Sequence, residues 1–138
     1  MTETVQLPVI DPGPDSLERE IAAKATAPRV TPADIEAEIV SEHYFTAADG
    51  ARMAPTGNMP IHSADLKTLG LLTFCVLVLR NGFTVTGESA CASPENFDAD
   101  IGKRIARANA EQKVWPLMGY ALRTRLGDAR RVEKDIII

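Results

Sequence analysis

The sequence predicts an α+β fold in which an antiparallel β-sheet, built on a hairpin, packs against two C-terminal helices, with another helix toward the N-terminus. An Asn81-Gly82 pair lies between two runs of strand character, and this pair is the strongest short-range hairpin signal. Thr31-Pro32 and Ser93-Pro94 each combine a helix N-cap residue with proline at the first helical position. The chain has 138 residues, which is the length of one domain.

The predicted hairpin joins residues 71–80 to residues 83–89. The first run is apolar at almost every position, which is typical of a central strand covered on both faces. The second run alternates between its two faces, and Gly87 within it marks a bulge or a close approach of another backbone or a ligand. A two-residue turn would place Cys75 opposite Glu88.

Helices are predicted on both sides of this hairpin. Residues 17–27 and residues 31–41 have helical character, and a third helix begins at Ser93. Pro116 is expected to end the third helix, because the residue before a proline avoids the α region, and to open a fourth helix that Gly127 ends. The apolar stripe of the third helix consists of Phe97, Ile101, Ile105, Ala108 and Trp115.

The segment between the second helix and the hairpin contains a strand and a loop. Residues 43–48 predict the strand, and Asp49-Gly50 predicts a turn after it. Residues 51–70 are rich in proline, glycine and asparagine and predict a long loop. Such loops are uncommon in compact domains unless they bind something, so Arg52 is the candidate for a second ligand site.

The chain divides into three parts. Residues 1–30 are expected to form a flexible or helical N-terminal arm, residues 31–127 a single α+β ligand-binding domain, and residues 128–138 a C-terminal tail. The tail ends in three isoleucines, which we expect to dock on the body or on a partner subunit because apolar side chains are poorly placed in water.

Several protein classes are disfavoured by the sequence. No apolar run approaches the roughly 18 residues of a membrane span, and the first residues lack the features of a signal peptide, so a cytoplasmic protein is expected. A phosphate loop, a nucleophile elbow and a paired-histidine metal motif are absent, so we expect no enzyme, no metal and no cofactor. The two cysteines fall on opposite faces of the predicted ribbon, which argues against a disulfide.

The net charge of −4 is unevenly distributed. Residues 1–93 carry 6 basic and 12 acidic side chains, whereas residues 94–138 carry 9 basic and 7 acidic ones. Eight of the cations lie within residues 101–131, and both a solvated helix surface and an attractor for phosphate fit this cluster. The negative net charge and the low aromatic content, 5%, disfavour nucleic acid as the partner.

The predicted helices place these cations on different faces. Arg104 and Asn109 flank the apolar stripe of the third helix, whereas Arg107 points away from it. Arg125 lies in the middle of the apolar face of the fourth helix, and Arg123 lies on the other side. Since a guanidinium on an apolar face needs a partner, Arg125 either pairs with an acid or binds an anionic ligand such as phosphate.

One block, residues 81–120, carries a resemblance. Its elements are Asn81-Gly82-Phe83, Gly87-Glu88-Ser89-Ala90-Cys91, Pro94-Glu95-Asn96-Phe97, Gly102, Ala106, Asn109-Ala110 and Trp115-Pro116-Leu117. With these elements the chain resembles, over roughly residues 31–126, a family of small phage accessory proteins. This family is taken to include the Thoeris anti-defence one type, the phage sponges for bacterial immune signals.

The resemblance implies a homodimer or hexamer with an antiparallel sheet against two C-terminal helices. It implies that cyclic ADP-ribose variants, and in some members cyclic oligonucleotides of the CBASS kind, are held without cleavage between the sheet of one subunit and the helices of its neighbour. The residues of this chain that would bind the ligand on this basis are Asn96, Phe97, Arg104, Arg107, Asn109, Arg123 and Arg125.

We therefore expect a phage anti-defence protein that sequesters a small cyclic nucleotide. Arginines would bind its pyrophosphate, and an aromatic ring or an apolar floor would bind its base. Two alternatives remain open. One is a phage protein that inhibits a host protein through its acidic N-terminal half, and the other is a nucleic-acid-binding accessory protein.

Overall fold

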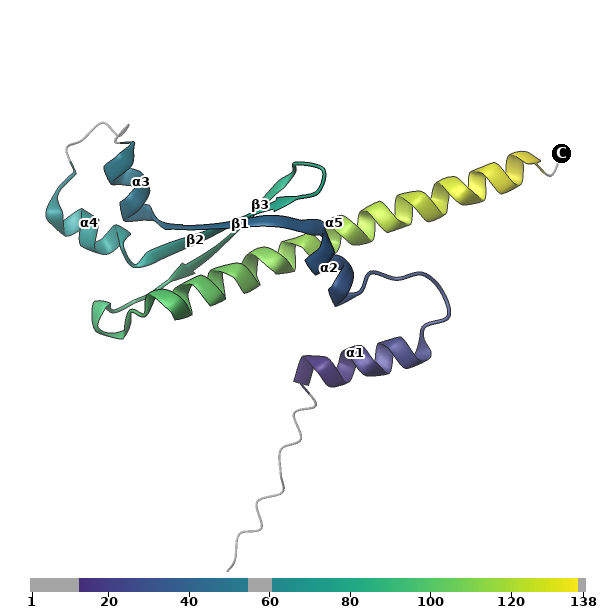
Figure 1. Cartoon of the computed structure of the whole chain (residues 1–138), viewed down its shortest axis with the longest axis horizontal. Helices are drawn as coiled ribbons and strands as arrows, with labels where there is room; N and C mark the ends of the chain where they lie inside the picture. The colour runs from purple at the N-terminus through teal and green to yellow at the C-terminus, as the bar shows by residue number, and fades with distance from the viewer. Residues whose placement is uncertain (1–12, 55–60, 137–138) are drawn as a thin grey trace, which may run out of the picture.

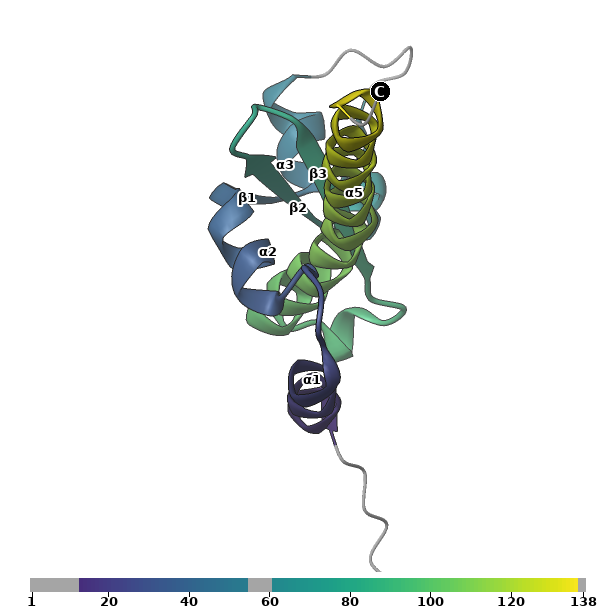
Figure 2. The ribbon, with the colours of Figure 1, turned by 90° about the vertical axis from the view of Figure 1, so that its right-hand side faces the viewer.

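The computed structural model describes residues 13–54 and 61–136 and confirms an α+β fold. Three antiparallel strands form one sheet in the order β1-β2-β3. Helix α5 runs along one face of this sheet, so that the two form separate layers (Figures 1 and 2). The elements are α1 (Gly13–Lys24), α2 (Pro32–Glu38), β1 (Ile39–Thr46), α3 (Ala47–Met53), α4 (Ser63–Leu69), β2 (Leu72–Leu79), β3 (Thr84–Ala90), the short 3-10 helix η1 (Pro94–Asn96) and α5 (Ala99–Ile136).

The two layers meet at Gly87 of β3. A Cβ atom at this position would lie 2.1 Å from the carbonyl oxygen of Ala106 and 2.3 Å from the amide nitrogen of Ala110, both in α5. These two alanines are fully buried, as is Val114 one turn further along the helix. The prediction of a close approach at Gly87 is thus confirmed, and the approaching group is the backbone of α5.

The predicted apolar stripe of the C-terminal helix is confirmed at Trp115, which packs against the core, but it is wrong at Ile101 and Ile105. Ile101 and Ile105 are 47% and 46% exposed. The side of α5 that faces the sheet carries Gly102, Ala106 and Ala110 instead. Only small side chains let the helix backbone come this near to the strands, so the larger apolar side chains lie on other sides of the helix.

The two predicted C-terminal helices form one continuous helix, α5, with Pro116 inside it. Gly127 also lies within this helix and does not end it. A proline removes one helical hydrogen bond, here to the carbonyl of Gln112, and Gln112 is exposed so that water can reach it. Trp115 and Met118 pack against the core on either side of the proline, which favours continuation of the helix. Beyond the sheet and the pocket residues, the last turns of α5 project away from the rest of the described chain (Figure 1).

The hairpin turn has three residues rather than two. Leu79 donates its N–H to the carbonyl oxygen of Phe83, 2.8 Å away, and Gly82 takes a left-handed conformation with φ of 86°. This is the three-residue hairpin in which glycine fills the left-handed position. The register therefore differs by one residue from the prediction, and Cys75 lies opposite Gly87.

The first strand begins earlier than predicted. α2 ends at Glu38 and β1 starts at Ile39, within the range that helical spacing assigned to a helix. Ile39 pairs with Leu79, and Arg80 donates its N–H to the carbonyl oxygen of Glu38 at 3.0 Å. These hydrogen bonds join segments about 40 residues apart, so the local sequence does not contain the signal that stops the helix.

The predicted turn at Asp49-Gly50 and the predicted loop over residues 51–70 are wrong where the structure describes them. α3 starts with a capping box in which the Thr46 hydroxyl accepts the N–H of Asp49 and the Asp49 carboxylate accepts the N–H of Thr46. α4 covers much of the second half of the predicted loop. Residues 55–60 lie outside the described part of the chain.

The helices nearest the chain ends are present with different bounds. α1 confirms a helix near the N-terminus but starts at Gly13. α5 starts after Asp98, whose carboxylate accepts the N–H of Ile101, whereas Ser93 precedes only the short helix η1. Residues 1–12 of the predicted arm and residues 137–138 of the predicted tail lie outside the described chain.

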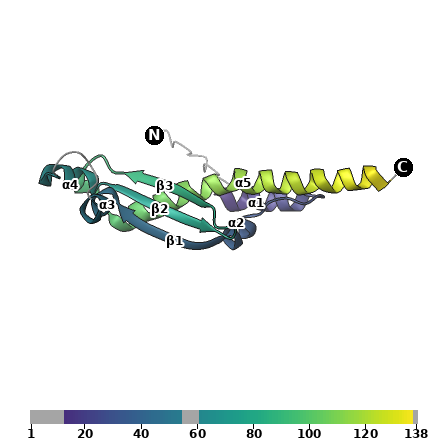
Figure 3. The same ribbon diagram turned by 90° about the horizontal axis from the view of Figure 1, so that it is seen from above.

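β2 is the central strand, as predicted, but one of its faces is open. Thr73, Cys75, Leu77 and Leu79 are buried beneath α5. The residues that alternate with them are half-buried on the opposite face, which no helix of the described chain covers (Figure 3). The predicted cover on both faces is wrong for this part of the chain.

Candidate anion-binding site

A pocket of about 530 Å³ lies at the end of the sheet where the β2–β3 loop meets α2 and the middle of α5. Its volume is within the range of about 300–1,000 Å³ that is usual for small-molecule sites. Its lining residues are Arg29, Val30, Asp34, Ala37, Glu38, Leu79, Arg80, Asn81, Phe83, Leu117, Met118, Ala121, Leu122 and Arg125.

Three arginines from different parts of the chain line the pocket. Arg29 precedes α2 and forms a partly buried salt bridge with Glu18 of α1. Arg80 lies in the hairpin loop and Arg125 on α5, and both are exposed. Within the described chain, no carboxylate lies within 4 Å of either Arg80 or Arg125. These two guanidiniums can therefore donate hydrogen bonds to an anionic ligand.

Two carboxylates, those of Asp34 and Glu38, line the pocket. Asp34 also stabilises the start of α2. Asp34 accepts the N–H of Thr31 at 2.8 Å and so completes the capping box of α2. This hydrogen bond lowers the pKa of Asp34, and the positive charges of Arg29 and Arg125 lower it further. Glu38, at the end of α2, is the second acid. The Arg29 guanidinium is paired with Glu18, so the two guanidiniums of Arg80 and Arg125 stand against the two carboxylates of Asp34 and Glu38.

The pocket also has an apolar part. Leu79, Met118 and Leu122 line it from the sheet and from α5. Phe83 lies at its edge and is 55% exposed. An accessible aromatic ring beside guanidiniums can stack on a flat base while the arginines bind phosphate oxygens.

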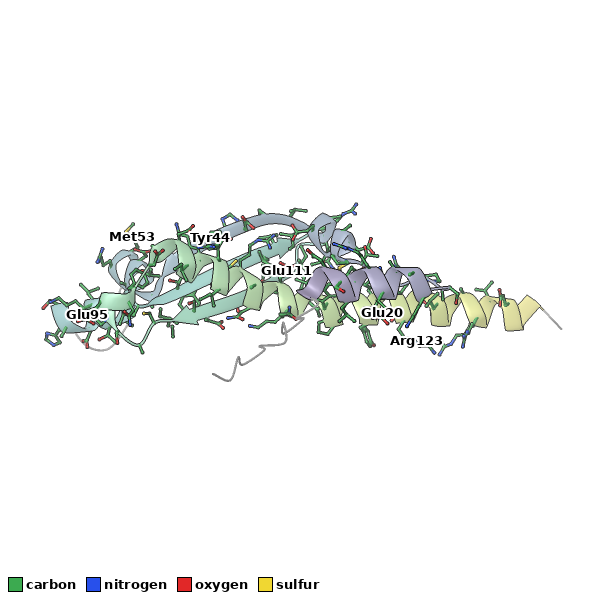
Figure 4. All side chains as sticks on the ribbon, turned by 90° about the horizontal axis from the view of Figure 1, so that it is seen from below. Glu20, Tyr44, Met53, Glu95, Glu111 and Arg123 are labelled. Atoms are coloured by element: carbon green, nitrogen blue, oxygen red, sulfur yellow. The ribbon has the colours of Figure 1, made fainter. Side chains whose placement is uncertain are left out.

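Of the predicted site residues, the structure places Arg125 in the pocket. Arg123 does not line it and lies on the part of α5 that projects beyond the sheet (Figure 4). The face that Arg125 shares with Leu117, Ala121 and Leu122 is thus the lining of the pocket, as the helical spacing indicated.

Three other predicted residues make local contacts away from the pocket. Arg104 forms an exposed salt bridge with Asp100, one turn away on α5. Asn109 donates a hydrogen bond from its side-chain nitrogen to the carbonyl oxygen of Glu88 at 2.8 Å, and so joins α5 to β3. Phe97 packs near Gly102 at the start of α5. Their roles in ligand binding stay predictions.

The other two candidates also lie outside the pocket lining. Asn96 is exposed at the end of η1, near the start of α5. Arg52, the candidate for a second site, lies in the last turn of α3, where it is exposed. No contact in the structure tests a ligand role for either residue.

Arg107 is surrounded by acids. Its guanidinium contacts Glu42 at 2.7 Å, Glu111 at 2.7 Å and Glu36 at 3.1 Å, and its side chain is only 25% exposed. The hydrogen bond with Glu42 and the further acids raise the pKa of Arg107 above its ordinary value. A ligand anion at Arg107 would have to replace one of these carboxylates.

Several residues of the pocket were not predicted from the sequence. Arg80 directly precedes the hairpin signal, and Phe83 directly follows it, so their place at the turn is the one local signal for a ligand contact. Arg29 lies two residues before the capping signal at Thr31. No local pattern brings Arg29 and Arg80 together with Arg125, because the three are separated by 45 residues or more along the chain.

Fold and pocket together define a small α+β protein with one helical layer on a three-stranded sheet and an arginine-lined cavity at the end of that sheet. The chain belongs to the Phage protein (N4 Gp49/phage Sf6 gene 66) family, whose model matches residues 30–126. The matched part contains every pocket residue except Arg29. No curated protein and no solved structure matches the chain.

The described residues contain neither a helix suited to cross a membrane nor a cluster of metal ligands. None of the helices in residues 13–54 and 61–136 is both long and apolar enough to cross a membrane. In the same residues, no three side chains of histidine, cysteine, aspartate or glutamate are grouped as metal ligands would be.

Proposed function

We propose that this phage-family protein binds a small cyclic nucleotide signal in the arginine-lined pocket and sequesters it without cleavage. The observation that carries the proposal is the pocket itself, in which Arg80 and Arg125 face a cavity with an apolar floor. The choice of ligand follows from the resemblance to phage sponges, so cyclic ADP-ribose isomers of Thoeris are the first candidates and CBASS cyclic oligonucleotides the second. The protein would act as an anti-defence factor in the cytoplasm of the infected bacterium.

The chemistry of the pocket supports a phosphorylated ligand with a base. A guanidinium donates two parallel hydrogen bonds, which match the oxygens of a pyrophosphate. The Phe83 ring and the side chains of Met118 and Leu122 offer apolar contact for the base. Sequestration requires tight binding and slow release, and it requires no group that activates water. The proposal therefore includes that the ligand is recovered unchanged and that the protein is not an enzyme.

Calorimetry with cyclic ADP-ribose isomers tests the proposal directly, with linear ADP-ribose and a short DNA duplex as comparison ligands. We expect heat with a cyclic nucleotide and none with the duplex. Mass spectrometry of the ligand after denaturation of the protein should then show the original compound. Absence of heat with every nucleotide, or recovery of a cleaved product, would contradict the proposal.

Paired variants locate the site. Arg125→Gln should weaken binding at least tenfold, because it removes one of the two guanidiniums without an acid partner in the described chain. Arg123→Gln lies two residues away on the same helix but outside the pocket and should bind as wild type does. Equal losses in both variants would show that general charge, and not the pocket, attracts the ligand.

A second candidate function is inhibition of a host protein. α1 carries the exposed apolar side chains of Leu17 and Ile21 and has few contacts with the rest of the described chain. An amphipathic helix of this kind can bind a groove on a partner protein. If this function is the main one, Leu17→Glu should abolish anti-defence activity in infected cells, whereas Arg125→Gln should leave it intact.

A further inference from the structure

Glu38 is a half-buried carboxylate of the pocket lining to which the proposed function gives no role. Within the described chain, no cationic group lies within 4 Å of it. It is the last residue of α2, the end where the helix dipole places partial negative charge, so the carboxylate does not stabilise this helix. A charged group that is partly buried without a partner is unfavourable. A ligand group that donates hydrogen bonds to Glu38 would supply the partner.

The backbone places Glu38 beside one of the two available guanidiniums. Arg80 donates its N–H to the carbonyl oxygen of Glu38 at 3.0 Å, so the two residues are neighbours where β1 begins and β2 ends. Adjacent strands are about 4.8 Å apart. Both side chains line the pocket, and they form no salt bridge with each other. The guanidinium and the carboxylate can therefore bind two different groups of one ligand.

A ribose is the group that a carboxylate in this position would meet, because in a nucleotide the phosphate is attached directly to a ribose. The 2′- and 3′-hydroxyls of a ribose donate hydrogen bonds, and a carboxylate has two oxygens that can accept them. In dinucleotide-binding folds an acidic residue binds a ribose hydroxyl in this way, whereas a phosphate at the same place needs an arginine. An acid beside a phosphate-binding guanidinium therefore matches a ribose and repels an additional phosphate.

We propose that the Glu38 carboxylate accepts hydrogen bonds from a ribose of the ligand and so makes the pocket selective for ribonucleotides over anions that consist of phosphate alone. The role of Glu38 rests on the proposed function, because it requires a nucleotide in the pocket. Asp34 is less suited to this role, because its Oδ2 atom already accepts the N–H of Thr31. With two carboxylates beside the guanidiniums of Arg80 and Arg125, the pocket disfavours a polyphosphate.

Calorimetry of the full chain with two probes tests the role of Glu38. Cyclic ADP-ribose contains a pyrophosphate and riboses, whereas inorganic pyrophosphate contains phosphates alone. Glu38→Gln should weaken the binding of cyclic ADP-ribose about tenfold, because an amide has one acceptor oxygen and no charge. The same variant should bind inorganic pyrophosphate about threefold more tightly than wild type, because a negative charge is removed. Opposite shifts support the proposal. Shifts in the same direction would overturn it, since they would reflect charge alone or a distorted pocket.

Cyclic inosine diphosphate ribose distinguishes contact with the ribose from contact with the base. It keeps the riboses of cyclic ADP-ribose but lacks the amino group of adenine. Glu38→Gln should therefore weaken its binding by the same factor. A loss confined to the adenine compound would assign Glu38 to the base and overturn the proposal.

Glu95→Gln is the matched control. It removes the same charge from an exposed residue of η1 that does not line the pocket (Figure 4). Both affinities should stay those of wild type. If Glu95→Gln shifts them as Glu38→Gln does, net charge and not a contact in the pocket is responsible, and the proposal is wrong.

Linear ADP-ribose separates the role of Glu38 from the proposed function. If wild type binds linear ADP-ribose but no cyclic compound, sequestration of a cyclic signal is wrong, and the opposite shifts measured with linear ADP-ribose still support the role of Glu38. If a cyclic compound binds equally well to wild type and to Glu38→Gln, the proposed function stands and the role of Glu38 is wrong. If wild type binds no ribonucleotide, both are wrong.

Discussion

At the scale of single residues, Gly87 and Asn109 set the distance between the sheet and its helix. Gly87 has no side chain, so the backbone of α5 lies directly on β3. Asn109 extends from the helix and donates a hydrogen bond to the carbonyl oxygen of Glu88, the next residue of that strand. Gly87 permits the close contact, and the hydrogen bond of Asn109 fixes the position of α5 along β3.

Gly87→Ala should be strongly destabilising. The added Cβ would overlap backbone atoms of Ala106 and Ala110, which cannot move without displacing α5. We expect a loss of about 3 kcal/mol in the free energy of unfolding, measured by urea denaturation. Gly127→Ala is the control, since nothing lies within 4 Å of its Cβ and alanine favours a helix by about 1 kcal/mol over glycine. A Gly87→Ala protein as stable as wild type would mean that α5 does not lie this close to β3.

Asp49 at the start of α3 should make stability depend on pH. Its hydrogen bond from the backbone of Thr46 lowers the pKa of the carboxyl group. A carboxyl group with a lower pKa in the folded state stabilises the fold above its unfolded pKa, about 3.9, and loses this contribution as the pH falls through the folded value. Asp49→Asn should therefore have a slightly lower Tm than wild type at pH 7, and the difference should disappear in strong acid. A difference in Tm that is the same at every pH would contradict this assignment.

At the scale of elements, the guanidinium of Arg107 links three of them through salt bridges. Arg107 on α5 contacts Glu36 on α2 and Glu42 on β1, as well as Glu111 on α5 itself. α2 is a helix of 7 residues, too short to be stable alone, so its contacts with β1 and α5 hold it in place. Residues of α2 also line the pocket, so the position of this helix affects the shape of the proposed ligand site.

Arg107→Leu should destabilise the protein by about 2 kcal/mol at neutral pH, since three carboxylates would be left close together without their cation. The deficit relative to wild type should shrink in acid, where the carboxylates become neutral. Urea denaturation at two pH values would measure both effects. Arg104→Leu, which removes an exposed salt bridge on the same helix, should cost less than about 0.5 kcal/mol. If both substitutions have equal effects, Arg107 does not organise these elements.

At the scale of the whole molecule, α1 is tied to the pocket by one described salt bridge. Glu18 of α1 binds Arg29, and Arg29 lines the pocket. The salt bridge with Glu18 also raises the pKa of Arg29. A phosphate in the pocket would compete with Glu18 for this guanidinium, so ligand binding and the docking of α1 should oppose each other.

Glu18→Gln should strengthen ligand binding about fivefold, which corresponds to about 1 kcal/mol, because Arg29 no longer has a competing carboxylate. The same substitution should increase hydrogen exchange in α1. Glu20→Gln is the control, since Glu20 pairs with Lys24 within the helix (Figure 4). Weaker ligand binding in Glu18→Gln would show that Glu18 positions Arg29 for the ligand and does not compete with it.

The features that could be predicted from the amino-acid sequence alone are those encoded over a few residues. The hairpin at Asn81-Gly82, the capped start of α2 at Thr31, and the need for space at Gly87 were all predicted, because each depends on the conformational limits of the residues concerned. The spacing of Arg125 on an apolar helical face predicted a residue that needs either an acid partner or an anionic ligand, and the structure places it in the lining of the pocket.

Contacts between distant parts of the chain set which face of each element is buried and which arginines lie close together. The close contact at Gly87 turned the small residues of α5 toward the sheet, although the larger apolar residues formed the clearer pattern in the sequence. Pairing of Ile39 with Leu79 ended α2 and brought the hairpin loop to it, so that Arg80 lies beside the same cavity as Arg29 and Arg125. Both outcomes depend on contacts between residues far apart in the chain, which local patterns do not encode.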